Sequence, residues 1–131
     1  MIGNSVIPYN DIDEEIVNLC KALNSIDGVE TVSSCCGHGR DLCRIWFTVK
    51  DIITLSRLCF HCFNHEGFWT IQVDLGDPDR TWEDLHFCLE STQICDQSDF
   101  DKLTNRLEQR GNDIKYSNEE WRSFRTKGGA G

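Results

Sequence analysis

The sequence predicts an α+β domain: a single antiparallel sheet of four to five strands with helices packed on a face, plus C-terminal helices. Two observations predict this class. Apolar and polar residues alternate in several short segments, as in half-buried strands, and other segments carry apolar residues at the spacing of one helix face. The predicted order is therefore helix, two strands, helix, two strands and then two helices.

The first predicted elements are a helix and a pair of strands. Asn10 and Asp11 precede apolar residues spaced along one helix face, which predicts a capped amphipathic helix over residues 11–25. β-branched residues at 29–36 and clear alternation at 43–50 predict two strands. A turn rich in glycine would join them.

A second helix and a second pair of strands follow. Asp51 is the expected cap of this helix. Its predicted apolar stripe consists of Ile52, Leu55, Cys59, Phe60 and Phe63. Alternation at 68–75 and at 85–89 predicts the third and fourth strands, with a loop at 76–79 between them. A short additional strand at residues 6–7 would pair at the sheet edge.

The C-terminal third is predicted to form two helices separated by a break. The first begins at residues 98–101 and stops at Gly111, and the second begins at the capping box of residues 117–120. Residues 127–131 are rich in glycine and are expected to be a flexible tail. The predicted domain therefore covers residues 1–126.

Charge and hydropathy exclude two classes of partner, nucleic-acid polymers and membranes. A formal net charge of -9 argues against binding of a nucleic-acid polymer, because polyanion binding needs clustered Lys and Arg. No segment approaches the ~20 apolar residues of a membrane span, and the N-terminus lacks the pattern of a signal peptide. We expect a cytoplasmic protein without a membrane partner, whose eight cysteines are mostly reduced.

The turn Gly37-His38-Gly39-Arg40 is the first candidate site. Two glycines allow positive φ angles that direct backbone N–H groups toward one point, and Arg40 adds a cation that suits a phosphate. Two alternatives stay open. The turn could be purely structural, or Cys35, Cys36 and His38 could join Cys59 and Cys62 as zinc ligands. We expect that no metal or cofactor is required.

The other candidate binding residues form two pairs, each of one arginine and one tryptophan. Alternation in the second strand directs Arg44 and Trp46 to the face without helices, where they suit stacking on a base or a subunit interface. Arg80 and Trp82 lie two residues apart in a polar segment and could hold a purine and its phosphate, unless Trp82 closes the core. Uncovered aromatic residues also predict a homo-oligomer built from dimers.

Catalytic motifs are not apparent in the sequence. It contains no nucleophile elbow, no phosphate-binding P-loop and no H-E-x-x-H. Cys35 or Cys36 could in principle pair with His38, but residues so close together at one strand end rarely orient correctly as a catalytic dyad. We therefore expect a binding protein without catalytic residues rather than an enzyme.

The segment 26–40, and above all its turn Ser34-Cys35-Cys36-Gly37-His38-Gly39-Arg40, resembles the phage anti-Thoeris sponge family. The resemblance implies a phage-encoded immune-evasion protein that sequesters cyclic ADP-ribose isomers, and in some members cyclic oligonucleotides, without cleaving them. It also implies α+β protomers that assemble into homo-oligomers. The alternatives are an acidic inhibitor of a host defence enzyme, such as an anti-CRISPR or anti-restriction protein, and a small zinc-binding accessory protein.

Overall fold

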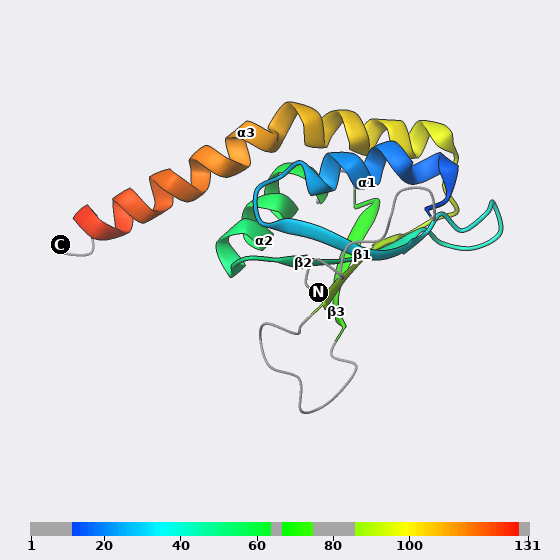
Figure 1. Ribbon diagram of the computed structural model, residues 1–131, viewed down its shortest axis with the longest axis horizontal. Helices are drawn as coiled ribbons and strands as arrows, with labels where there is room; N and C mark the ends of the chain where they lie inside the picture. The colour runs from blue at the N-terminus through cyan, green and yellow to red at the C-terminus, as the bar shows by residue number, and fades with distance from the viewer. Residues whose placement is uncertain (1–11, 64–66, 75–85, 129–131) are drawn as a thin grey trace.

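The computed structural model describes residues 12–63, 67–74 and 86–128, with the backbone alone described at 74, 113 and 115–128. Figure 1 shows the arrangement of its elements. In chain order they are the 3-10 helix η2 (Glu14–Ile16), α1 (Val17–Asn24), β1 (Val29–Cys35), β2 (Arg44–Val49), α2 (Ile52–Leu58), the π-helix η3 (Cys59–Phe63), β3 (Trp69–Asp74), β4 (His86–Ser91) and α3 (Gln97–Gly128).

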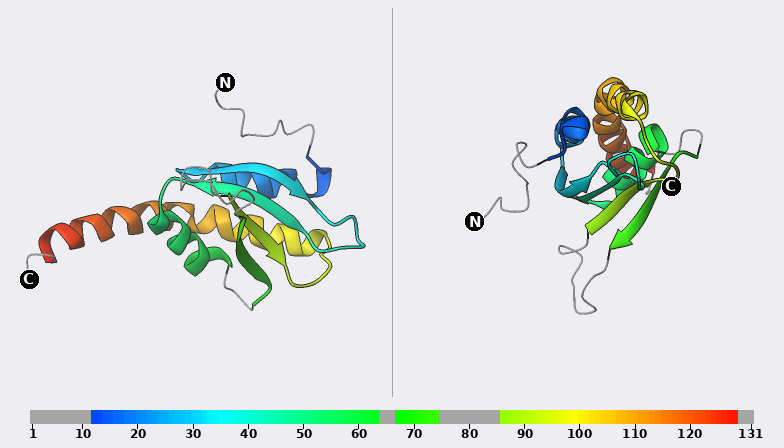
Figure 2. Two further views of the ribbon diagram at one scale, coloured as in Figure 1. Left: turned by 90° about the horizontal axis from the view of Figure 1, so that it is seen from below. Right: turned by 90° about the vertical axis from the view of Figure 1, so that its right-hand side faces the viewer.

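The described strands form one antiparallel four-stranded sheet in the order β1-β2-β4-β3. Because β2 and β3 both run antiparallel to β4, they point the same way, and the connection through α2 and η3 crosses over the position of β4. The helices gather on one face of this sheet (Figure 2). The α+β fold expected from the sequence is confirmed.

The hydrophobic core lies between the sheet and the helices. Ile45 and Phe47 of β2 are fully buried on the covered face. The Phe47 ring contacts those of Phe63 and Phe87, with centroids 6.2 Å and 6.0 Å away. Since neighbouring side chains alternate along a strand, Arg44 and Trp46 point to the opposite, uncovered face, as the sequence predicted.

The predicted strands at 29–36 and 43–50 are confirmed as β1 and β2, and the helix expected after Asp51 is confirmed as α2. The Asp51 carboxylate caps α2 by accepting a hydrogen bond from the Thr54 N–H, at 2.8 Å. The first helix starts later than residue 11, because Asp13 has a non-helical backbone and its side chain caps no helix N–H. Instead the Asp13 carboxylate accepts a hydrogen bond from the backbone N–H of Cys36, at 2.9 Å.

The predicted apolar stripe of the second helix is only partly correct. Leu55 and Phe63 are buried, but Ile52 is 58% and Phe60 69% exposed. Phe60 lies in the π-helix η3 that follows α2, and a wider turn rotates its side chain away from the face that a regular α-helix would bury. Ile52 is the first residue of α2.

The third and fourth strands are confirmed as β3 and β4. Trp69 is buried, whereas Val73 is 55% exposed because the end of the edge strand β3 extends away from the helix layer (Figure 1). The predicted loop at 76–79 and edge strand at 6–7 lie outside the described residues.

The prediction of two C-terminal helices is wrong, because α3 is one helix that passes through Gly111 and the capping box at 117–120. Leu107 and Ile114 are both buried, and a continuous helix keeps residues of this spacing on one face. The helix also reaches Gly128, two residues into the expected tail. Figure 1 shows its C-terminal half extending beyond the sheet.

Replacing Gly111 with alanine is expected to stabilise the protein. Glycine in a helix interior costs about 0.5 to 1 kcal/mol relative to alanine, and a Cβ at Gly111 would meet only Ile26 Cγ1, at 4.0 Å. We expect the free energy of unfolding to rise by this amount, measured by urea denaturation. A loss of stability would instead support the helix end that the sequence predicted at Gly111.

Candidate functional site

The turn between β1 and β2 contains three consecutive residues with positive φ: Gly37 at 88°, His38 at 54° and Gly39 at 71°. Glycine is required at position 37, since a Cβ there would lie 2.1 Å from the carbonyl oxygen of Asp41. His38 is the residue for which this conformation is costly, because side chains other than glycine rarely adopt it. The turn therefore holds His38 in a strained and specific position.

Much of the backbone of this turn is used within the protein. The N–H groups of Arg40 and Asp41 both donate to the carbonyl oxygen of Gly37, at 2.9 Å and 3.0 Å. The His38 N–H donates to Cys36 Sγ at 3.3 Å. The expected convergence of backbone N–H groups on an anion is therefore wrong for these donors. The turn instead offers the exposed side chains of His38 and Arg40.

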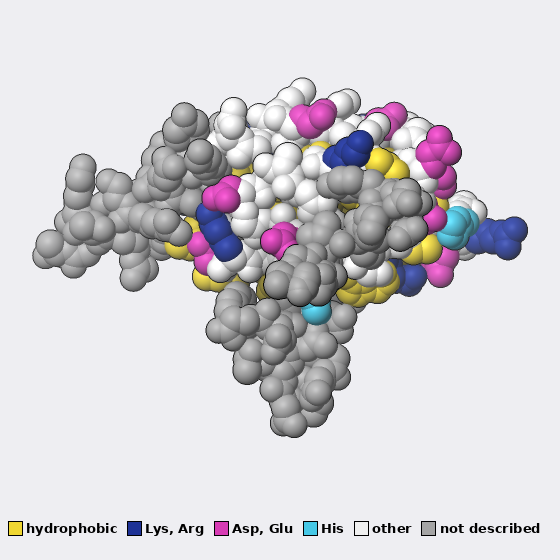
Figure 3. Space-filling view, in the orientation of Figure 1, with side chains coloured by type: hydrophobic (Ala, Val, Ile, Leu, Met, Phe, Trp, Pro, Cys, Tyr) yellow, Lys and Arg dark blue, Asp and Glu magenta, His cyan; other side chains and the backbone are white. Residues whose placement is uncertain are grey.

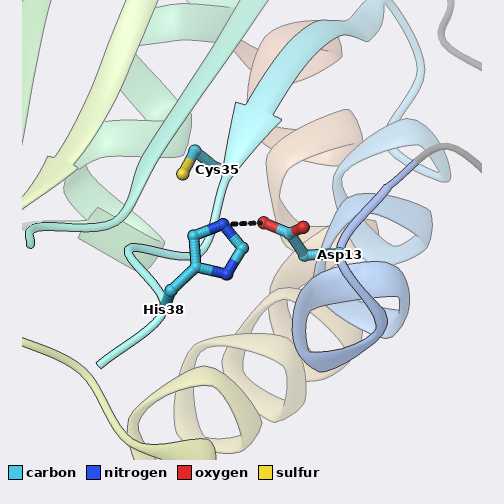
Figure 4. Close-up of side chains that lie close together, drawn as sticks. All are labelled: Asp13, Cys35 and His38. Carbon is cyan, nitrogen blue, oxygen red and sulfur yellow. Dashed lines mark ion pairs between the residues drawn. The ribbon is translucent and has the colours of Figure 1, made fainter. Parts of the chain in front are cut away.

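Asp13 and Glu15, at the start of the first helix, lie against the turn. His38 Nε2 is 3.6 Å from Asp13 Oδ2, and Figure 4 shows Cys35 beside this pair. On the other side, the Cys36 thiol donates to Glu15 Oε2 at 3.1 Å, and its Sγ is 3.6 Å from His38 Nδ1. Neither carboxylate was predicted from the sequence, because both precede the turn by more than 20 residues. Their position in an acidic helix start is the only signal that the sequence offers.

These contacts form two overlapping groups of possible metal ligands among the described residues. One contains Asp13, Cys35 and His38, and the other contains Glu15, Cys36 and His38. Within each group the ligand atoms lie within 4.8 Å of one another. Neither group includes Cys59 or Cys62, so the zinc ligand set considered from the sequence is not assembled.

Burial keeps several thiols protonated. The pKa of Cys36 is raised to about 12, first by burial and then by its hydrogen bond to Glu15. Burial likewise raises the pKa of Cys62 to about 12 and that of Cys20 to about 11. A thiol is nucleophilic as the thiolate, so these three cysteines are poor nucleophiles at neutral pH.

On the uncovered face, Arg44 belongs to a polar network. Its Nε donates to Glu90 Oε2 at 2.6 Å, and its Nη1 lies 3.5 Å from Asp41 Oδ2. Gln72 donates to the other oxygen of Glu90, at 2.7 Å. Arg44 is thus paired with two carboxylates and is less suited than Arg40 to neutralise a ligand phosphate.

Trp46 lies beside this network, between Ser33 of β1 and Cys88 of β4 in the sheet register. It is half-buried, so part of its indole remains accessible. Cys35 and Arg44 form the register pair of β1 and β2 that lies next to the turn. The structure therefore places the turn, Arg44 and Trp46 along one end of the sheet.

Arg80 and Trp82 lie outside the described residues, so their predicted contribution stays a prediction.

A groove lies between α1 and α3 and has a volume of about 540 Å³. Nothing in the sequence predicted it. Its polar lining includes Asn18, Lys21, Ser25, Asp101, Thr104 and Glu108. The groove does not favour an anion, because its two carboxylates, Asp101 and Glu108, outnumber its one cation, Lys21. Figure 3 shows a histidine and a basic side chain beside acidic side chains at another place, the right-hand end of the molecule, where Figure 1 draws the turn between β1 and β2.

Comparisons with protein-family models, curated proteins and solved structures found no match. Among the described residues, no helix combines the length and the apolar character needed to cross a membrane.

Proposed function

We propose that this protein binds and sequesters a small phosphorylated nucleotide signal without cleaving it, and that a cyclic ADP-ribose isomer is the first ligand to test. The observation that carries the proposal is an exposed Arg40 on a constrained turn, which leads into β2 with its half-buried Trp46. A guanidinium pairs with phosphate oxygens, and an accessible indole stacks on a base.

Arg40 is the cation best placed to receive the phosphate. Among the described residues, no carboxylate pairs with Arg40, whereas Arg44 is held by Glu90 and Asp41. The negative net charge does not forbid an anionic ligand, because distant surface charges are screened over ~8 Å in physiological salt. A local contact to Arg40 acts within a much shorter distance.

The biological role follows from the resemblance of the turn to the anti-Thoeris sponge family. We propose a phage-encoded immune-evasion protein that acts in the host cytoplasm as a homo-oligomer and removes the signal from its receptor. Protonation of the buried thiols supports binding rather than nucleophilic catalysis.

Recovery of an intact ligand tests this function. The purified protein is mixed with cyclic ADP-ribose isomers, and the free nucleotide is measured after ultrafiltration. The retained fraction is then heated and analysed by mass spectrometry. We expect depletion of free ligand and release of an unchanged molecule. No depletion would contradict binding, and recovery of a cleaved product would contradict sequestration.

Replacing Arg40 with alanine is expected to weaken nucleotide binding about ten- to a hundredfold, because a charge-assisted contact to phosphate contributes about 1.5 to 3 kcal/mol. Arg57→Ala is the matched control, since Arg57 lies on α2 in the helix layer. Calorimetric titration measures both affinities, and thermal melts verify that both variants fold. Equal affinities for the two variants would remove Arg40 from the site.

A further inference from the structure

We propose that the chain binds one divalent transition-metal ion, with Zn²⁺ as the best match, through Asp13, Cys35 and His38. This site does not depend on the nucleotide proposal. It replaces the expectation from the sequence that no metal is bound. It also differs from the zinc ligand set weighed there, because a carboxylate from the start of the first helix takes the place of Cys59 and Cys62.

The distances between the ligand atoms suit a small ion. With metal–ligand bonds of about 2.0 to 2.3 Å, a tetrahedral ion holds its ligand atoms roughly 3.3 to 3.8 Å apart. His38 Nε2 and Asp13 Oδ2 are already 3.6 Å apart, and all three ligand atoms lie within 4.8 Å of one another. Small side-chain rotations would therefore complete the coordination, with Cys35 approaching the His38–Asp13 pair from above in Figure 4.

Neighbouring groups restrict the positions of two of the three proposed ligands, Asp13 and His38. The Cys36 N–H donates to Asp13 Oδ2 at 2.9 Å, which orients the carboxylate as outer hydrogen bonds commonly do at metal sites. His38 sits at φ 54°, in a turn closed by two hydrogen bonds to the Gly37 carbonyl. A costly backbone conformation at a potential ligand is the kind of strain that occurs at functional sites.

The donor atoms favour zinc over the hard cations. One thiolate sulfur, one imidazole nitrogen and one carboxylate oxygen form a set that Zn²⁺ and Co²⁺ accept, whereas Mg²⁺ and Ca²⁺ require oxygen ligands. The His38 side chain is 61% exposed, so an ion can enter from solvent. On binding, Cys35 loses its thiol proton to solvent and forms the metal–sulfur bond. Three protein ligands leave a fourth position for water.

The second group, with Glu15 and Cys36 in place of Asp13 and Cys35, is the weaker candidate. Cys36 is almost fully buried, and its thiol proton is already donated to Glu15 at 3.1 Å. Metal binding there would have to break that hydrogen bond and open the core. Cys35 is only half-buried, and Figure 4 shows it beside the His38–Asp13 pair.

Cobalt titration of the full chain tests the site with the metal alone. Metal-free protein is titrated with Co²⁺, and the charge-transfer absorption of a thiolate–cobalt bond is recorded. Zn²⁺ is then added to displace the cobalt, and its affinity is measured by calorimetry. We expect one ion per chain, an absorption that develops with Co²⁺ and disappears with Zn²⁺, and release of protons on binding.

Four variants test the sulfur and nitrogen ligands. Cys35→Ser is expected to remove the charge-transfer absorption, and both Cys35→Ser and His38→Asn to lower the Zn²⁺ affinity at least tenfold. Asparagine is chosen because it tolerates positive φ better than other residues. Cys59→Ser, which changes a half-buried thiol in η3, and Cys36→Ser should keep the absorption. Circular dichroism verifies the fold of each variant.

Two results would overturn the proposal. The first is a charge-transfer absorption that survives in Cys35→Ser, whether or not Cys36→Ser removes it. The second is the absence of stoichiometric binding to the native chain. Neither result bears on nucleotide binding, which is measured separately without added metal.

Discussion

Replacing Phe47 with alanine is expected to lower the free energy of unfolding by about 3 to 5 kcal/mol. Phe47 is fully buried in β2 and contacts the rings of Phe63 in η3 and Phe87 in β4. Its removal would leave a cavity where the sheet meets the helix layer. Domains of this kind unfold with only about 5 to 15 kcal/mol, so the loss is a large share of the total.

Urea denaturation followed by circular dichroism measures this change. Phe60→Ala is the matched control, because Phe60 is 69% exposed although the sequence placed it in an apolar stripe. We expect the control to change the free energy of unfolding by less than about 0.5 kcal/mol, as is usual at exposed positions. Similar losses in the two variants would contradict the burial that the structure assigns to them.

Replacing Gly37 with alanine is expected to cost about 3 kcal/mol or more. The backbone at Gly37 has φ 88°, and the added Cβ would lie 2.1 Å from the Asp41 carbonyl oxygen. The conformational penalty alone is about 1 to 3 kcal/mol. The clash adds to it because backbone atoms must move, which also disturbs the hydrogen bonds that Arg40 and Asp41 donate to Gly37.

Gly39→Ala provides the comparison within the same turn. Gly39 also has positive φ, 71°, but a Cβ there would meet no atom within 4 Å. We expect its cost to stay at about 1 to 2 kcal/mol, the conformational part alone. Thermal melts of both variants measure the difference. Equal melting temperatures would mean that the turn relaxes freely around residue 37.

Local patterns were sufficient to predict most of the sheet. Alternation at 43–50 predicted β2 and the faces of Arg44 and Trp46, because period two is a property of the strand itself. Asp51 was predicted as a cap for the same local reason, and its carboxylate does accept the Thr54 N–H. Where structure depends on neighbours close in the chain, sequence reasoning was reliable.

Predictions that depended on distant contacts were wrong or incomplete. Glycine propensity predicted a helix end at Gly111, but burial of Leu107 and Ile114 on one face outweighs a cost of about 1 kcal/mol. The widened turn of η3 left Phe60 exposed, although Phe63 is buried as predicted. Asp13 reaches the turn only because the helix start packs against it, and no spacing rule connects positions 23 residues apart.

The strand order has a consequence for synthesis on the ribosome. β4 is the last of the described strands in chain order, yet it lies between β2 and β3, and β3 pairs with no other strand of the described sheet. In a nascent chain that ends before residue 86, β1 and β2 can therefore already pair with each other. The edges of β2 and β3 that later pair with β4 still have no partner. The sheet closes only when residues 86–91 emerge, so the growing chain carries unpaired strand edges until late in translation.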